Sequence, residues 1–103
     1  MYITTDITTE ELKTKLDNKE EFVFIDVREP HEYEEFNLGA KLIPLGDIPG
    51  ALNDLEQYKE KEIVIHCRSG ARSGNAKKFL VEMGYKNVKN LLGGVVRWQQ
   101  LYS

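Results

Sequence analysis

Cys67 is the one cysteine in this chain of 103 residues, and its neighbours are of the types that activate a thiol. The apolar run 63–66 before it has the composition of a buried strand. Gly70 follows in a short loop, which can turn its backbone N–H groups toward one point and form an anion-binding nest. Arg68 and Arg72 add two positive charges. We expect this loop to bind an anion and to hold Cys67 as a nucleophile.

Each of these features favours the thiolate over the thiol. The N–H groups and the positive end of a following helix stabilise negative charge, and so do the two arginines. Such surroundings lower the pKa of a cysteine from about 8.5 into a range of about 3.5 to 7.5. The alternative is a structural cysteine that fills the core as a small apolar side chain. A single cysteine excludes an internal disulfide, a four-cysteine metal site and a CxxC pair.

Hydrophobic periodicity predicts strands that alternate with helices around this loop. Strands are expected at 22–27, 63–66 and 88–92, and helices at 9–17, 30–36, 51–58, 73–83 and around Trp98. The first helix has the sequence of a capping box, with Thr8 as the N-cap and Glu11 reaching back to it. This alternation indicates βαβ units and a parallel sheet, in which ligands bind outside the carboxyl ends of the strands. Cys67 is at that end of the second strand.

Polar residues near the end of the first strand are assigned structural roles. We expect Asp26 to accept backbone N–H bonds. Arg28 is expected to pair with a glutamate such as Glu32 or Glu35, in an acidic run that otherwise forms a solvated face. Side chains alternate along a strand, so His66 should point away from the thiol and pack in the core, where it does not serve as a base.

Four segments, taken together, resemble the rhodanese-type sulfurtransferases and occur in that family's order. They are the loop 67–73 (CRSGARS), the stretch 26–33 (DVREPHEY), the IPL at 43–45, and Gly93-Gly94 with Trp98. The resemblance spans essentially the whole chain. It implies the single-domain rhodanese fold, an α/β domain over residues 1–103 whose mainly parallel sheet of about five strands lies between helices.

The resemblance also implies a reaction. Cys67 would take a sulfane sulfur from thiosulfate or a persulfide donor, hold it as a persulfide, and pass it to cyanide or a thiol. The implied substrate-binding residues are Arg68, Ser69, Gly70, Ala71 and Arg72, with Ser73, Asp26 and Arg28 as support for the loop. A chain with one thiol has no resolving cysteine of its own, so an external acceptor is required. No cofactor is expected.

One segment departs from the family pattern, and two other functions stay open. Many members carry G-H-I-x-G-A before the IP, whereas 36–40 (FNLGA) has Asn37 in place of the histidine and is one residue shorter. The family pattern therefore does not tell which residues form the rim of the pocket. Cysteine phosphatases and arsenate reductases of the same fold use C-x5-R, whereas the spacing from Cys67 to Arg72 is C-x4-R. A non-catalytic rhodanese-like module that only binds partners is the other alternative, although such modules commonly lose the cysteine.

The composition of the chain limits the classes of partner that we expect it to bind. Lys and Arg total 14 against 17 Asp and Glu, a net charge of −3, so there is no basic excess to bind nucleic acid. The apolar runs are too short to cross a bilayer, and residues 1–6 do not begin a signal peptide, so we expect a cytoplasmic protein with no membrane partner. Two separated histidines with one cysteine make a poor metal site. We expect a monomer that meets a small anionic sulfur donor and a thiol or protein acceptor.

Overall fold

Four parallel strands form the sheet of the computed structural model, which describes residues 5–102. Their order is β2-β1-β3-β4, with β1 at Val23–Asp26, β2 at Lys41–Leu42, β3 at Glu62–His66 and β4 at Asn87–Asn90. The mainly parallel α/β sheet is confirmed, with four strands where about five were expected. Beside β4, Ile7 adds a single bridge to Leu91. The sequence pattern did not predict β2, because two residues carry no readable alternation.

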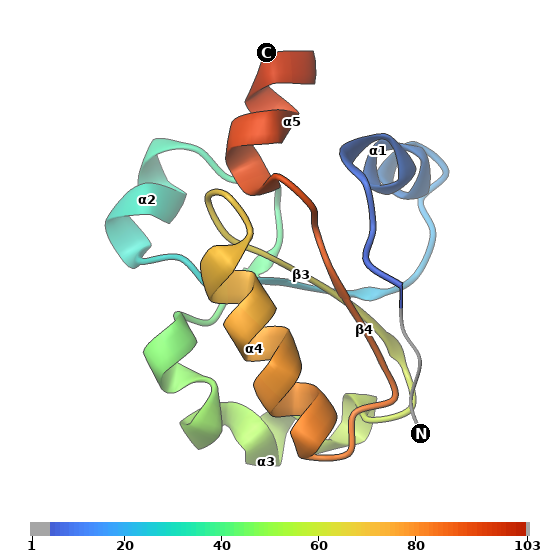
Figure 1. Ribbon diagram of the computed structural model, residues 1–103, viewed down its shortest axis with the longest axis vertical. Coiled ribbons are helices and arrows are strands. Elements are labelled where there is room, and N and C mark those ends of the chain that lie inside the picture. The colour runs from blue at the N-terminus through green and yellow to red at the C-terminus, as the bar shows by residue number, and fades with distance from the viewer. Residues whose placement is uncertain (1–4, 103) are drawn as a thin grey trace.

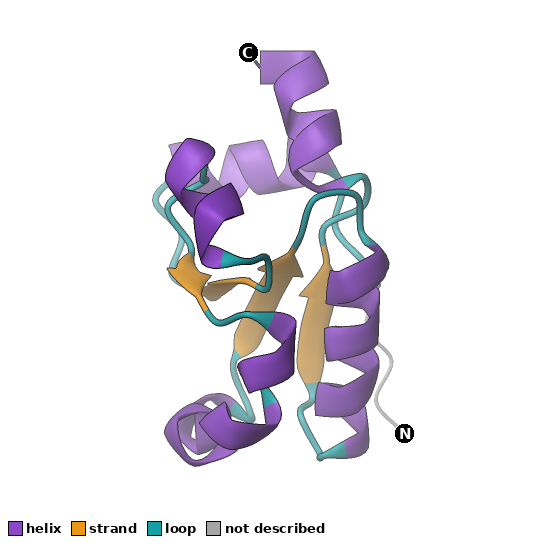
Figure 2. Cartoon of the chain, turned by 90° about the vertical axis from the view of Figure 1, so that its left-hand side faces the viewer, coloured by secondary structure: helices purple, strands orange, loops and turns teal. Residues whose placement is uncertain are grey.

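Helices cover both faces of the sheet, and α2 lies at its carboxyl end (Figures 1 and 2). The α-helices are α1 Thr9–Asp17, α2 Pro30–Glu35, α3 Leu52–Leu55, α4 Ala71–Glu82 and α5 Gly94–Tyr102. Short 3-10 turns occupy Leu45–Asp47, Pro49–Ala51 and Glu56–Tyr58. The helix expected at 51–58 is therefore one α-helical turn with 3-10 turns on either side of it. Its two leucines are three residues apart, a spacing that suits either helix type, so the pattern did not separate them.

Alternation along β3 divides the core into two layers. Ile63 and Ile65 pack toward α3 and α4, in a cluster that also holds Cys67. Val64 faces the other side, with Leu12 of α1 and the half-buried Trp98 of α5. The sheet thus separates the core layer that contains Cys67 from the core layer under α1 and α5.

The ends of two helices test the expectations from sequence. The capping box of α1 is confirmed, since Thr8 Oγ1 accepts from Glu11 N at 3.1 Å and Glu11 Oε1 accepts from Thr8 N at 2.9 Å. Gly84, with φ of 94°, stops α4 as expected. Met83 was expected on the buried stripe, but it is the C-cap of α4 and is 42% exposed.

None of the helices among the described residues is long and apolar enough to cross a membrane. The expectation that no signal peptide begins the chain rests partly on residues 1–4, which lie outside the described residues.

Candidate active site

Cys67 follows β3 at the carboxyl end of the sheet, and hydrogen-bond donors surround its sulfur. The residue is 1% exposed. Its Sγ accepts N–H bonds from Gly70 at 3.2 Å and from Ser73 at 3.4 Å, and it lies 3.3 Å from the hydroxyl of Ser73. The donors come from one junction between loop and helix, so they form a nest around a single atom. This arrangement stabilises a negative charge on the sulfur.

The nest depends on the backbone of Gly70. This residue is the N-cap of α4 and has φ of 113°, a left-handed conformation that favours glycine. The helix begins at Ala71, two residues before the predicted start, because Gly70 already completes the turn. Ser73 therefore lies in the first helical turn, where backbone N–H groups have no partner within the helix. Its N–H is free to reach the sulfur, whereas Ser69 and Ala71 are exposed.

The balance of these effects lowers the pKa of the Cys67 thiol below its ordinary value. Burial alone raises the pKa, because it disfavours the charged form. The hydrogen bonds from the side chain and backbone of Ser73, and from the N–H groups of Gly70 and Ser69, lower it by more. The thiolate therefore persists to lower pH than it does for free cysteine.

A pH titration tests this conclusion. The thiolate absorbance of the folded protein should rise at a lower pH than that of free cysteine, because the nest favours the charged form. The chain has one cysteine and five tyrosines, so the difference in absorbance between the original protein and Cys67→Ser reports Cys67 alone. After unfolding in urea, the titration should return to the free-cysteine range. A folded protein that titrates above free cysteine would contradict the stabilising role of the nest.

His66 lies next to the cysteine but points to the opposite face of the sheet, as expected. It is fully buried, and its ring lies 5.3 Å from that of Phe24. Burial lowers the pKa of His66, and this outweighs the opposing charge of Asp26. The neutral, packed histidine is not placed to act as a base for the thiol.

Asp26, the last residue of β1, and Arg28 form a buried ion pair. Arg28 Nη2 lies 2.8 Å from Asp26 Oδ2, and its Nε lies 3.0 Å from Oδ1. Asp26 also accepts the backbone N–H of Arg28, which confirms one expectation. The expected pairing of Arg28 with a glutamate side chain is wrong. The guanidinium instead donates to the carbonyl oxygens of Glu32 and Phe36, and so ties the end of β1 to α2.

We expect Asp26→Ala to destabilise the protein by about 3–5 kcal/mol, because it leaves the guanidinium of Arg28 buried without its carboxylate. Arg28 is 4% exposed. The matched control is Asp17→Ala, which breaks a surface pair with Lys13 and should cost less than about 1 kcal/mol. Urea unfolding measures both. Equal losses would show that the buried pair has no special role.

Arg72 lies in the thiol loop, residues 67–73, and pairs with Glu32 on α2. The pair is bidentate, with distances of 2.7 and 2.9 Å. The hydrogen bonds from Arg72 hold the pKa of Glu32 at about 2, so both groups are charged at neutral pH. The expectation that Glu32 belongs to a solvated face is wrong. The sequence did not indicate this contact, because its partners are 40 positions apart.

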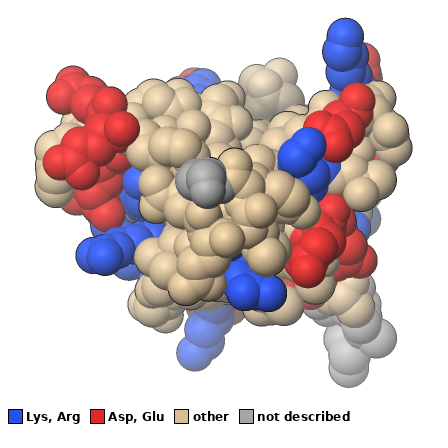
Figure 3. Space-filling model, turned by 90° about the horizontal axis from the view of Figure 1, so that it is seen from above, with Lys and Arg blue, Asp and Glu red and all other residues tan. Residues whose placement is uncertain are grey.

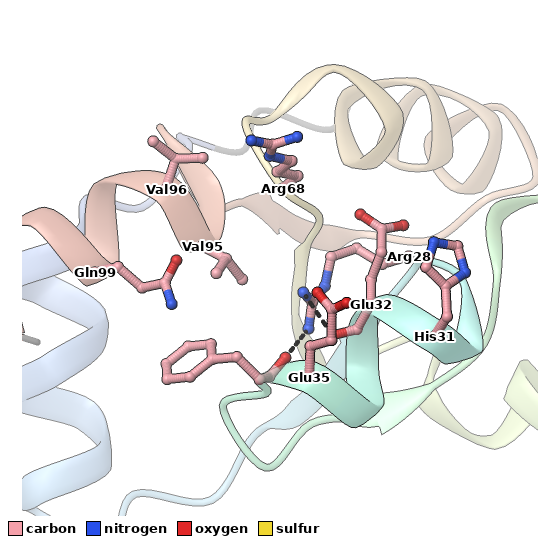
Figure 4. Close-up of a pocket in the computed structure, with 9 residues that line it drawn as sticks. Arg28, His31, Glu32, Glu35, Arg68, Val95, Val96 and Gln99 are labelled. Carbon is pink, nitrogen blue, oxygen red and sulfur yellow. Dashed lines mark hydrogen bonds between the residues drawn. The ribbon is translucent and has the colours of Figure 1, made fainter.

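An open pocket of about 620 Å³ lies beside the thiol loop, between α2 and α5. Figure 4 shows Glu32, Glu35 and His31 on the α2 side, Val95, Val96 and Gln99 on the α5 side, and Arg68 at the loop. The buried Arg28 also lines it. Arg68 is exposed and Arg72 does not line the pocket, so Arg68 is the arginine of the loop that a ligand here would meet.

The first residues of α5 form hydrogen bonds with the backbone of the thiol loop. Val95 N donates to the carbonyl oxygen of Cys67 at 3.0 Å, and Val96 N donates to that of Arg68 at 2.9 Å. These bonds pull the loop carbonyls toward α5, which leaves the loop N–H groups free to face the sulfur. Gly94 permits this approach, because a Cβ there would lie 2.4 Å from the carbonyl oxygen of Arg68.

Asn90, the last residue of β4, also contacts the loop, and our sequence reasoning missed it. Its Oδ1 lies 2.5 Å from Ser73 Oγ, and its Nδ2 donates to the carbonyl of Gly70 at 3.1 Å. One signal could have found it. Asn90 lies within the third predicted strand, 88–92, whose carboxyl end shares one edge of the sheet with Asp26 and Cys67.

Comparison with known proteins identifies the family of the chain. The sequence model of the family described as Rhodanese-like domain matches residues 8–101. The chain belongs to the rhodanese-like domain family. It is 43% identical over 95 residues to "Putative sulfurtransferase YtwF" of Bacillus subtilis, a match that covers 91% of this chain and 89% of that protein. It is 35% identical over 94 residues to a "Sulfurtransferase" of Allochromatium vinosum, covering 90% and 86%.

Solved structures of rhodanese-like proteins share the fold. The crystal structure of a rhodanese-like domain protein from Staphylococcus aureus matches with a TM-score of 0.81 and 34% identity, over 93% of this chain and 91% of that chain. The expected rhodanese-like fold is therefore confirmed. The sulfurtransferase names of the relatives support sulfur transfer as the general chemistry of this rhodanese-like domain.

Proposed function

We propose that the protein transfers a sulfane sulfur from an anionic or persulfide donor to an external thiol, through a persulfide on Cys67. The observation that carries the proposal is the set of donors around Sγ, two backbone N–H groups at 3.2 and 3.4 Å and a hydroxyl at 3.3 Å. They stabilise a thiolate in the resting protein and negative charge at the same place during transfer.

The reaction balances without a cofactor. With thiosulfate, the Cys67 thiolate attacks the outer sulfur, the sulfur–sulfur bond of the donor breaks, and sulfite leaves with the electron pair. The product is a persulfide anion on Cys67. An acceptor thiolate, or cyanide, then attacks the terminal sulfur. The bond from Sγ to that sulfur breaks, and Cys67 returns to the thiolate as a new persulfide or thiocyanate is released.

The contacts of Arg72 weigh against the phosphatase and arsenate reductase alternative. A C-x5-R loop uses its arginine to bind an oxyanion over the cysteine. In this chain the guanidinium of Arg72 makes a bidentate pair with Glu32, so both of its Nη atoms already donate to a carboxylate. A module that only binds partners would need no activated thiol, so the donors around Cys67 favour catalysis over that alternative.

The charged side chains that line the pocket favour a sulfur donor that contacts Arg68. Seen from the end of the molecule that carries α5, acidic side chains gather at the left, over α2 (Figure 3). Glu32 and Glu35 of α2 line the same pocket, whereas Arg68 comes from the thiol loop. An anionic sulfur donor would therefore bind at the Arg68 side, next to Cys67.

Mass spectrometry after incubation with a panel of donors tests the proposal. The panel is thiosulfate and glutathione persulfide. We expect a protein heavier by one sulfur atom that returns to its original mass when cyanide is added, with release of thiocyanate. An unmodified protein with both donors would overturn the proposal. Hydrolysis of an aryl phosphate at a comparable rate would favour the phosphatase alternative.

Arg68→Ala should raise the KM for thiosulfate by about tenfold, because one charge-assisted hydrogen bond to the donor is lost. The persulfide should still form at a saturating concentration of donor. Arg97→Ala is the matched control, since Arg97 is exposed on α5 and does not line the pocket. Steady-state kinetics measure both variants. An equal KM in the two would show that Arg68 does not contact the donor.

A further inference from the structure

The hydroxyl of Ser73 has more acceptors than it can serve. Its Oγ lies 3.3 Å from Cys67 Sγ, 3.3 Å from the carbonyl oxygen of Gly70, and 2.5 Å from Asn90 Oδ1. A serine hydroxyl has a single proton to donate. The shortest of the three contacts is the one to Asn90, so Asn90 competes with the sulfur for this proton.

The orientation of the Asn90 amide makes it an acceptor toward Ser73. Its Nδ2 lies 3.1 Å from the carbonyl oxygen of Gly70, and two oxygen acceptors would repel one another at that position. Nδ2 must therefore face Gly70 and Oδ1 must face Ser73. A backbone hydrogen bond also holds Asn90 in place, because the N–H of Asn90 donates to Asp6 Oδ1 at 3.1 Å. Oδ1 carries no proton, so Ser73 is the donor in this contact.

We propose that Asn90 is a positioning residue that acts on Cys67 through the single hydroxyl proton of Ser73. While the sulfur is uncharged, as a thiol or as the inner sulfur of a persulfide, the proton stays with Asn90. When the sulfur becomes a thiolate, the hydroxyl turns toward Sγ and gives up its bond to Asn90. Asn90 thus sets how strongly Ser73 stabilises the thiolate.

The turn of the Ser73 hydroxyl from Asn90 to Sγ matters at one step of sulfur transfer. The role at this step rests on the proposed function. Cys67 is the leaving group when the acceptor removes the terminal sulfur, and negative charge then returns to Sγ. The Ser73 proton meets that charge as it develops, and no new donor needs to enter the buried site.

The ionisable groups around this cluster are the same in every variant needed to test it. They are His66 on β3, Arg68 in the loop, Arg72 on α4 with its partner Glu32 on α2, the Asp26–Arg28 pair after β1, and the Asp6–Lys77 pair beside Asn90. The charge of Arg72 interacts directly with that of Cys67. A difference between variants at Ser73 and Asn90 therefore reports the hydrogen bond.

A double-mutant cycle read by the thiolate absorbance of Cys67 tests the inference. Asn90→Leu keeps the number and branching of the side-chain heavy atoms but removes both polar groups, and Asn90→Ala is a second variant should the first fail to fold. With Ser73 present, either change should give about tenfold more thiolate at a pH on the lower limb of the titration, because the hydroxyl is released to the sulfur. In the Ser73→Ala background the same change should have no such effect.

Asn87→Leu is the matched control, because Asn87 lies on the same strand at the end far from the loop. It should leave the titration of Cys67 unchanged. An equal shift from the Asn90 variants with and without the Ser73 hydroxyl would overturn the inference, since a structural or desolvation effect needs no hydroxyl. The titration uses no sulfur donor, so it stands even if no donor loads Cys67 and the proposed function fails.

Discussion

Cys67→Ser should abolish sulfur transfer, leaving no thiocyanate release above the background of the buffer. The serine hydroxyl can still accept the N–H bonds of the nest, so the loop should keep its shape. Its oxygen is a far weaker nucleophile at neutral pH than a stabilised thiolate, and it forms no persulfide. The variant should therefore separate chemistry from folding. Thiocyanate release measures the activity, and thermal unfolding measures the fold.

The control for this variant is a loop residue of similar size that is exposed. Ser69→Ala changes a side chain that has no hydrogen bond to the sulfur, although its backbone N–H contributes to the pKa of Cys67. It should retain sulfur transfer within a fewfold of the original protein. If Cys67→Ser kept its turnover, the assignment of the nucleophile would be wrong.

Gly94→Ala should both destabilise the protein and disable the thiol loop. A Cβ at this position would lie 2.4 Å from the carbonyl oxygen of Arg68 and 2.6 Å from that of Cys67, and both are backbone atoms. The residue also has φ of 55°, where a side chain adds strain. Together these effects should cost about 2–5 kcal/mol. For a domain of this size, this lowers Tm by about 10 °C or more.

The loss of activity should exceed what unfolding explains. The start of α5 must move away from the loop, which breaks the bonds from Val95 N and Val96 N to the loop carbonyls. The nest around the sulfur then loosens, and the thiolate titration should move toward that of free cysteine at temperatures where the variant is still folded. Gly50→Ala is the matched control, since a Cβ there meets nothing within 4 Å. A Gly94→Ala protein with an unchanged titration would show that α5 does not support the loop.

The sequence by itself was sufficient where the decisive contacts are local. The capping box of α1 joins residues three positions apart, and the structure reproduces the predicted bounds Thr9–Asp17. The thiol loop also consists of neighbours, since Gly70 and Ser73 follow Cys67 within six positions. Backbone conformation and the free N–H groups at the start of a helix were enough to predict that they converge.

The sequence pattern was a weaker guide where it is compatible with more than one local structure. The two-residue β2 and the 3-10 turns around α3 show too few periods to be recognised. Met83 continues the predicted apolar stripe, but α4 ends before it. The pairing of Arg28 was mistaken for a related reason, because several acidic residues lie within its reach and the sequence does not rank them.

Only the tertiary structure decided which residues surround the loop from other elements. Glu32 takes up the guanidinium of Arg72 across 40 positions, Asn90 reaches Ser73 across 17, and the start of α5 holds the carbonyls of Cys67 and Arg68. These contacts arise because parallel strands bring their carboxyl ends to one edge of the sheet. Residue types near Cys67 thus predicted an activated thiol, whereas the packing of α2, β4 and α5 determined which charges and protons act on it.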